Sequence, residues 1–154
     1  MNGVEQLSRN IRRAADGIKD FQGFFENALD IIAARSDSLF AAQGSNVQKG
    51  PAWPPLSEKT LKARKNRWGY YKRSPSRPGI LRWTGNLQEK RDRHVSPMKG
   101  SLTFAMPYSG YHQDGSGKLP KRVIVDLSNP TNVEIVRALQ AHMHKAVGTF
   151  GKQR

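Results

Sequence analysis

The N-terminal segment of the chain carries the pattern that most restricts its fold. Apolar residues recur there at alternating intervals of three and four over four heptads, at Val4, Leu7, Ile11, Ala14, Ile18, Phe21, Phe25, Ala28 and Ile32. This spacing places them on one face of an α-helix. The pattern therefore predicts one long helix over about residues 4–42, weakened at Gly17 and Gly23 and with any bend near Gly17.

This predicted helix is long for a chain of 154 residues. At 1.5 Å per residue it would extend over about 50 Å, which is more than one small domain covers. Two interpretations follow. The apolar seam packs on the chain's own core, or part of it packs on a neighbouring subunit. The second interpretation makes Val4, Leu7, Ile11, Phe21 and Phe25 candidate interface residues.

Breaker residues and periodicities divide the rest of the chain. Pro and Gly mark a loop from Gly44 to Pro55, and Ser57 is placed to cap a short helix. Alternating patterns predict a hairpin of strands 86–95 and 101–106 and a third strand over 122–127. A capping box at Thr131 and Glu134 predicts a helix over 131–146.

The expected fold class is α+β, with a long N-terminal helix, a small antiparallel sheet with a hairpin, and a C-terminal helix. We expect one domain overall. Its parts are the helix of residues 1–43, a Pro/Gly-rich and basic-aromatic loop region over 44–79, the sheet and C-terminal helix over 80–147, and a flexible tail over 148–154.

Positive charge is the strongest compositional signal. Lys and Arg number 26 against 12 Asp and Glu, which gives a net charge of +14, and residues 51–100 hold thirteen of these cations against three acids. Such a surface favours polyanions or acidic proteins. The chain has no cysteine, which excludes disulfides, cysteine-ligated zinc and thiol chemistry. It has no membrane-length apolar run and no signal-like N-terminus, so we expect a soluble protein of a cytosol-like compartment and no membrane partner.

Patterns typical of enzymes are missing. The four histidines lack metal-ligand spacing, no nucleophile elbow occurs, and Gly115-Ser116-Gly117-Lys118 lacks the leading glycine of a phosphate loop. The sequence therefore predicts no catalytic residues, no metal and no cofactor.

A basic stretch interrupted by aromatic residues lies near the middle of the chain. Its cations are Lys62, Arg64, Lys65, Arg67, Lys72, Arg73 and Arg77, and its aromatic residues are Trp68, Tyr70 and Tyr71. These residues could contact DNA phosphates and stack on bases, dock on a partner subunit, or form a solvated face. No known nucleic-acid module occurs, so sequence-specific binding is not expected.

Four short motifs follow one another in a set order. They are Gly50-Pro51-Ala52-Trp53-Pro54-Pro55-Leu56-Ser57 with Thr60 and Lys62, Gly79-Ile80-Leu81-Arg82-Trp83-Thr84-Gly85-Asn86-Leu87, Tyr108 with Tyr111-His112-Gln113-Asp114-Gly115, and Leu119-Pro120-Lys121-Arg122-Val123-Ile124-Val125-Asp126-Leu127-Ser128. In this order they resemble the tailed-phage virion morphogenesis proteins, the Mu-like and tail-completion (gpS-type) group. The resemblance covers about residues 40–130.

The resemblance implies a structural, non-enzymatic protein of the phage neck. Such proteins assemble in the host cytoplasm into a homo-oligomeric ring, for which six subunits are expected here. The ring completes or terminates the tail and joins it to the head, so its partners are other neck and tail proteins and, in a lumen, packaged DNA. The alternative is a non-sequence-specific nucleic-acid-binding protein, for which the net charge is the argument.

Within these motifs the residue types predict structural roles. Trp53 and Leu56 are expected to pin their loop to the core, because a buried Trp is a large anchor. Thr84 and Gly85 are expected to form a tight turn in which Gly85 adopts a backbone state closed to other residues. Pro120 and Arg122 are expected to begin the third strand. The remaining motif positions singled out are His112, Gln113 and Gly115.

Overall fold

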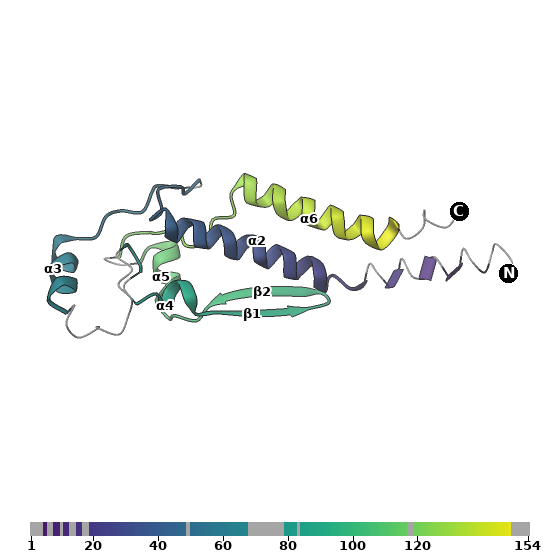
Figure 1. Cartoon of the computed structure of the whole chain (residues 1–154), viewed down its shortest axis with the longest axis horizontal. Helices are drawn as coiled ribbons and strands as arrows, with labels where there is room; N and C mark the ends of the chain where they lie inside the picture. Colours follow the sequence, from purple (N-terminus) through teal and green to yellow (C-terminus); the bar gives the residue numbers. More distant parts are fainter. Residues whose placement is uncertain are drawn as a thin grey trace. The chain divides into compact units, whose positions relative to one another are not determined.

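The computed structural model describes residues 5, 8, 9, 11, 12, 15, 16, 19–48, 50–67, 79–82, 84–116 and 119–148. The elements are α2 (Gln22–Ala41), α3 (Glu58–Arg67), α4 (Asn86–Glu89), β1 (Arg91–Ser96), β2 (Lys99–Phe104), α5 (Ser109–Asp114) and α6 (Asn129–Gly148) (Figure 1). β1 and β2 form a two-stranded sheet. The predicted α+β class is confirmed, with an N-terminal helix, an antiparallel hairpin and a C-terminal helix.

Two compact units divide the chain. Unit 1 comprises Met1–Ile32, Arg93–Leu102 and Asn129–Arg154, and unit 2 comprises Ala33–Asp92 and Thr103–Ser128. Helix α2 and both strands contribute residues to each unit. Unit 1 therefore contains α6 and most of the hairpin, whereas α3, α4 and α5 belong to unit 2.

The predicted continuous helix over 4–42 is interrupted. The described residues between 5 and 19 are helical, but Asp20 and Phe21 are not, and α2 begins at Gln22. The Phe21 N–H donates to the Pro97 carbonyl (2.9 Å) instead of to a helical carbonyl. The Asp20 carboxylate accepts the N–H of Gln22 (2.9 Å), which caps the new helix start. Gly17, where a bend was expected, lies outside the described residues.

Aromatic contacts hold unit 1 together. The rings of Phe21 and His142 lie 5.3 Å apart, and the rings of Phe24 and Phe25 lie 5.2 Å apart. Gly100 of β2 approaches so closely that a Cβ there would lie 2.9 Å from the Cβ of Phe25. The first half of α2 is thus covered within unit 1 both by β2 and by α6.

The larger hydrophobic core lies in unit 2. Its buried residues are Leu39, Phe40, Trp53, Leu87 and Ile124. Two come from the second half of α2, and the others come from three separate segments. The core therefore joins parts of unit 2 that are far apart in the sequence.

Several predicted boundaries need correction. The hairpin pairs residues 91–96 with 99–104, because Gly85 starts the short helix α4 where the first strand was expected. Residues 122–127 do not form a strand. Helix α6 begins at Asn129 with Pro130 in its first turn, where the missing N–H has no helical partner to lose. Thr131 therefore lies inside the helix rather than at its cap.

Candidate functional site

The extended segment that was expected to be a third strand is held by side chains. Gln113 of α5 accepts the N–H groups of Ile124 (2.9 Å) and Val125 (3.0 Å) on its Oε1, and its Nε2 donates to the Val125 carbonyl (3.0 Å). The Ser36 hydroxyl donates to the Ile124 carbonyl (2.8 Å). These bonds satisfy the groups that a sheet would otherwise pair, so the segment needs no neighbouring strand.

Trp53 anchors its loop to the same segment. The side chain is 5% exposed, and its Nε1 donates to the Val123 carbonyl (2.8 Å). Its ring packs edge-on against Phe40, with centroids 5.4 Å apart. Gly44 makes room for it, because a Cβ at that position would lie 2.0 Å from the indole ring. Trp53 therefore has the anchoring position predicted for it, while Leu56 is only half-buried.

The side chain of Arg122 connects the extended segment 122–127 to the loop that follows Trp53. The residue is 5% exposed. Its Nε and Nη2 donate to the Pro54 carbonyl (3.2 and 3.0 Å), and Nη2 also donates to the Pro55 carbonyl (3.3 Å). Its own N–H donates to the His112 carbonyl (2.7 Å). Instead of beginning a strand with Pro120, Arg122 joins three motifs.

The motif that contains residues 80–87 forms a turn at the start of α4. Gly85 has a φ of 81°, as expected for a position closed to other residues, and the Thr84 hydroxyl accepts the N–H of Asn86 (3.4 Å). Leu87 follows into the core at 2% exposed. Leu81 also has a positive φ, of 62°, which is uncommon for a leucine. Its neighbour Ile80 donates its N–H to Oε1 of Gln43, which lies in the turn that follows α2, and this bond holds the backbone in place.

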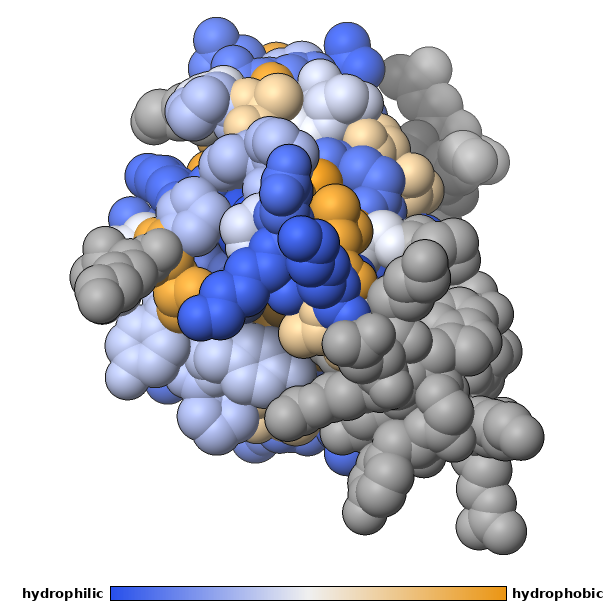
Figure 2. Space-filling view, turned by 90° about the vertical axis from the view of Figure 1, so that its left-hand side faces the viewer, coloured by the Kyte–Doolittle hydropathy of each residue, from blue (hydrophilic) through white to orange (hydrophobic). Residues whose placement is uncertain are grey.

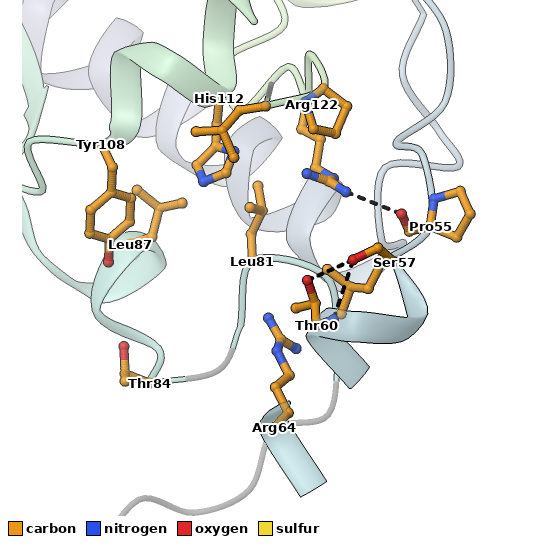
Figure 3. A pocket seen from close by; sticks show the side chains of 13 residues that line it. Pro55, Ser57, Thr60, Arg64, Leu81, Thr84, Leu87, Tyr108, His112 and Arg122 are labelled. Atoms are coloured by element: carbon orange, nitrogen blue, oxygen red, sulfur yellow. Dashed lines mark hydrogen bonds between the residues drawn. The ribbon is translucent and has the colours of Figure 1, made fainter. Parts of the chain in front are cut away.

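A pocket of about 390 Å³ lies among these motifs. Every one of the four contributes to its lining, together with the start of α3. The lining residues in the described part of the chain are Pro55, Leu56, Ser57, Thr60, Arg64, Leu81, Thr84, Leu87, Tyr108, His112, Leu119, Pro120 and Arg122. Figure 3 shows Arg64 reaching from α3 toward Leu81, with Arg122 and His112 above.

Helix α3 presents its first turn to the pocket because Ser57 caps it. The Ser57 hydroxyl accepts the N–H of Thr60 (3.3 Å) and lies 2.9 Å from the Thr60 hydroxyl, which confirms the predicted cap. One turn later, Arg64 Nη1 donates to the Gly79 carbonyl (2.7 Å). The capped start of α3 thus positions one guanidinium at the pocket.

The electrostatics of the pocket are positive. Burial lowers the pKa of Arg64, and burial together with the charge of Arg64 lowers the pKa of Arg122. Burial, followed by the charge of Arg122, also lowers the pKa of His112, which favours the neutral imidazole. His112 Nδ1 is buried, and within the described ranges no hydrogen-bond partner reaches it. The pocket therefore combines two partly buried guanidinium groups with an imidazole whose neutral form is favoured.

The residues expected at a subunit interface and in the basic stretch differ in burial, and several lie outside the described ranges. Phe21 and Phe25 are half-buried in unit 1, and Ile11 is 56% exposed. Lys62 is exposed on α3, which also contains Lys65 and Arg67. The other expected residues lie outside the described ranges: Val4, Leu7, Trp68, Tyr70, Tyr71, Lys72, Arg73 and Arg77.

A buried ion pair in unit 2 was not anticipated from the sequence. Arg35 Nη2 contacts Asp126 Oδ2 at 2.8 Å, and these side chains are 15% and 1% exposed. Arg35 Nη2 also donates to the Asn46 carbonyl (2.6 Å), and Asp126 Oδ2 accepts the N–H of Gln48 (3.0 Å). The only available signal was the unusual placement of an Arg among apolar residues of the helix.

Among the described residues no group of three or more His, Asp or Glu side chains could hold a metal ion. No helix in those ranges has the length and apolar character needed to cross a membrane. No protein family, no curated protein and no solved structure matches this chain.

Proposed function

We propose that this chain is a structural subunit of the neck of a tailed phage, and that it forms a ring that completes or terminates the tail and joins it to the head. The observation that carries this proposal is the convergence of the four motifs behind the resemblance. Hydrogen bonds from Trp53, Gln113 and Arg122 connect three of them, and Leu87 places the fourth in the same core. Motifs that build one core support a shared fold better than unconnected matches would.

Exposed apolar side chains support assembly with further copies. Val133 and Val136 of α6 are 47% and 50% exposed, and residues three apart lie on one helix face. A ring repeats one interface between two different surfaces of each subunit, so each surface must match the other. In this proposal the exposed face of α6 is one of these two surfaces.

The decisive test uses the virions of the phage that encodes this chain. We expect mass spectrometry to find the chain in purified virions and cryo-electron microscopy to locate it as a ring, with six subunits, between head and tail. Deletion of its gene should leave filled heads and free tails that do not join. Absence of the chain from purified virions would overturn the proposal.

The basic stretch separates two versions of this function. Changing Lys65, Arg67, Lys72 and Arg73 together to Gln removes four positive charges and keeps side-chain polarity. A stretch that docks on an acidic neighbour predicts heads and tails that fail to join, and we favour this version because aromatic residues together with Arg are enriched at protein interfaces. A stretch that meets DNA in the lumen predicts normal joining and a late defect in genome retention or ejection.

The charge of +14 favours one other function, non-sequence-specific binding of nucleic acid. Light scattering of the nuclease-treated full chain, followed by titration with duplex DNA at several salt concentrations, separates the two. Assembly into a closed ring without nucleic acid agrees with the neck proposal. A monomer that binds any duplex tightly, with affinity falling steeply with salt, supports the alternative.

A further inference from the structure

The pocket of unit 2 has two kinds of wall. Arg64 and Arg122 contribute guanidinium groups, whereas Leu81, Leu87 and Tyr108 contribute carbon and an aromatic ring. The His112 ring packs edge-on against that of Tyr108, with centroids 6.1 Å apart. Figure 3 shows Leu87 and Tyr108 together, away from the two arginines, with Leu81 between the groups. A ligand that fits both walls carries an anionic group at one end and an apolar group at the other.

No acidic side chain lines the arginine side. Asp and Glu are absent from the pocket lining among the described residues. The segments outside the described ranges contain no Asp or Glu at all, because all 12 acidic residues of the chain fall within those ranges. The positive charge of the pocket is therefore not balanced by any Asp or Glu at its lining.

Arg122 is firmly held in the wall of the pocket. It is 5% exposed, and its Nε and Nη2 are engaged by the carbonyls of Pro54 and Pro55. Neutral carbonyl oxygens satisfy its hydrogen-bonding groups but leave its charge uncompensated. Burial of an unpaired charge is costly, so a bound anion would relieve a penalty that the folded chain already carries.

The pocket is also reachable and of suitable size. Tyr108 and Leu119 line it and are 39% and 44% exposed, so the pocket extends to the surface of unit 2. Figure 2 draws a face on which hydrophobic residues form small patches between hydrophilic ones. A volume of about 390 Å³ suits a small organic molecule or a short chain end, and a bare inorganic ion would leave most of it unfilled.

We propose that this pocket binds an organic carboxylate, with the carboxylate between Arg64 and Arg122 and an apolar group against Leu81, Leu87 and Tyr108. Guanidinium and carboxylate groups match in shape and form paired, charge-assisted hydrogen bonds. The Ser57 and Thr60 hydroxyls lie at the same pocket and are hydrogen-bonded to each other (2.9 Å), so one of the two can donate to a carboxylate oxygen. Either a free organic acid or the C-terminal carboxylate of another protein carries this chemistry. The site does not depend on ring assembly.

The first experiment titrates the full chain with 4-phenylbutyrate, which joins a carboxylate to an apolar ring, and follows binding by calorimetry and NMR. We expect saturable binding, with shifts at the backbone amides of Leu81, Leu87 and His112. Acetate, which lacks the apolar group, and 4-phenylbutyramide, which lacks the charge, should each bind at least about tenfold more weakly. Equal binding of the acid and the amide, or no saturation by the acid at millimolar concentration, would overturn the proposal.

Two variants on one helix provide a matched control. Arg64→Gln and Lys62→Gln each remove one positive charge from α3, but Lys62 is exposed and does not line the pocket. We expect Arg64→Gln to weaken 4-phenylbutyrate binding about tenfold and Lys62→Gln to leave it nearly unchanged. Equal effects would show that only the general charge matters and would contradict the proposed site. Thermal unfolding of both variants, with Arg64→Lys as a conservative third, establishes that the folded chain is being compared.

A third arm identifies the source of the carboxylate. A blocked pentapeptide that ends in a free leucine carboxylate is compared with its C-terminal amide and with 4-phenylbutyrate. Tighter binding of the peptide acid than of 4-phenylbutyrate assigns the pocket to the end of a protein chain. Tighter binding of 4-phenylbutyrate assigns it to a free organic acid. Both results depend on Arg64 if the proposal is correct.

Discussion

Unit 1 and unit 2 keep their backbones in place by different means. In unit 1, α6 and the hairpin residues 93–102 are regular elements. Phe21 donates its N–H to Pro97 of the hairpin turn, and its ring packs against that of His142 on α6. In unit 2, extended segments are held by individual polar side chains, chiefly Ser36, Trp53, Gln113 and Arg122. The stability of a unit built in this second way depends on single residues. Each polar side chain satisfies buried backbone groups that form no hydrogen bonds with a neighbouring strand.

The largest expected difference is between one buried ion pair of unit 2 and one exposed ion pair of unit 1. Asp126→Ala leaves Arg35 buried without its partner and should cost about 3–5 kcal/mol of unfolding free energy. The matched change Asp30→Ala breaks the exposed pair with Arg93 in unit 1, where the side chains are 67% and 38% exposed, and should cost no more than about 1 kcal/mol. Urea unfolding followed by circular dichroism measures both. Similar losses would remove the proposed difference between the units.

Replacement of Gln113 tests the side-chain scaffold directly. Gln113→Met keeps the length of the side chain but leaves the N–H groups of Ile124 and Val125 without an acceptor, so we expect a loss of about 2–4 kcal/mol. Gln140→Met, on an exposed position of α6, should change stability by less than about 0.5 kcal/mol. Hydrogen exchange at the amide of Ile124 reports the local loss. Unchanged protection there would mean that Gln113 does not hold this segment.

Replacing each of two glycines by alanine should change the stability of the chain in opposite directions. Gly85 has a φ of 81°, so Gly85→Ala should cost about 1–2 kcal/mol. Gly23 lies in α2, and no neighbouring atom of the described residues comes within 4 Å of where a Cβ would lie, so Gly23→Ala should stabilise the chain by about 0.5–1 kcal/mol. Melting temperatures of the two variants suffice as the measurement. Stabilisation by both changes would contradict the left-handed turn at the start of α4.

The smallest effect concerns pH. Burial and the charge of Arg122 lower the pKa of His112 in the folded chain, so the unfolded chain binds the proton first as the pH falls. Stability from this group is fully present above about pH 6.5, the ordinary histidine value, and is lost as the pH falls from there toward the lowered pKa. His112→Gln should reduce the loss of melting temperature between about pH 7.5 and pH 5. His144→Gln, at an exposed position of α6, serves as the control.

Local patterns in the sequence predicted the features that local chemistry determines. The cap at Ser57, the turn at Gly85 and the anchoring of Trp53 each depend on neighbouring residues or on one large side chain. The prediction of a third strand over residues 122–127 was wrong. An alternating pattern indicates which side chains are buried, but it does not indicate which groups form hydrogen bonds with the backbone. Here the partner is the side chain of Gln113.

Contacts between distant segments were beyond the reach of these patterns. The interruption at Phe21 depends on the carbonyl of Pro97, which lies in the hairpin turn between β1 and β2. The pair of Arg35 and Asp126 joins residues 91 positions apart. The pocket could not be predicted for the same reason. The sequence shows its four motifs separately, and only the three-dimensional structure shows that they line one pocket.

The hydrogen bonds made by the backbone of residues 122–125 also affect how this segment can pair with another chain. An extended segment with open N–H and C=O groups is a template on which a second chain can add a strand, in specific complexes as well as in fibrils. Here the N–H groups of Arg122, Ile124 and Val125 and the carbonyls of Val123, Ile124 and Val125 are already bonded within unit 2. This segment is consequently protected from strand exchange, although its residue pattern is that of a strand.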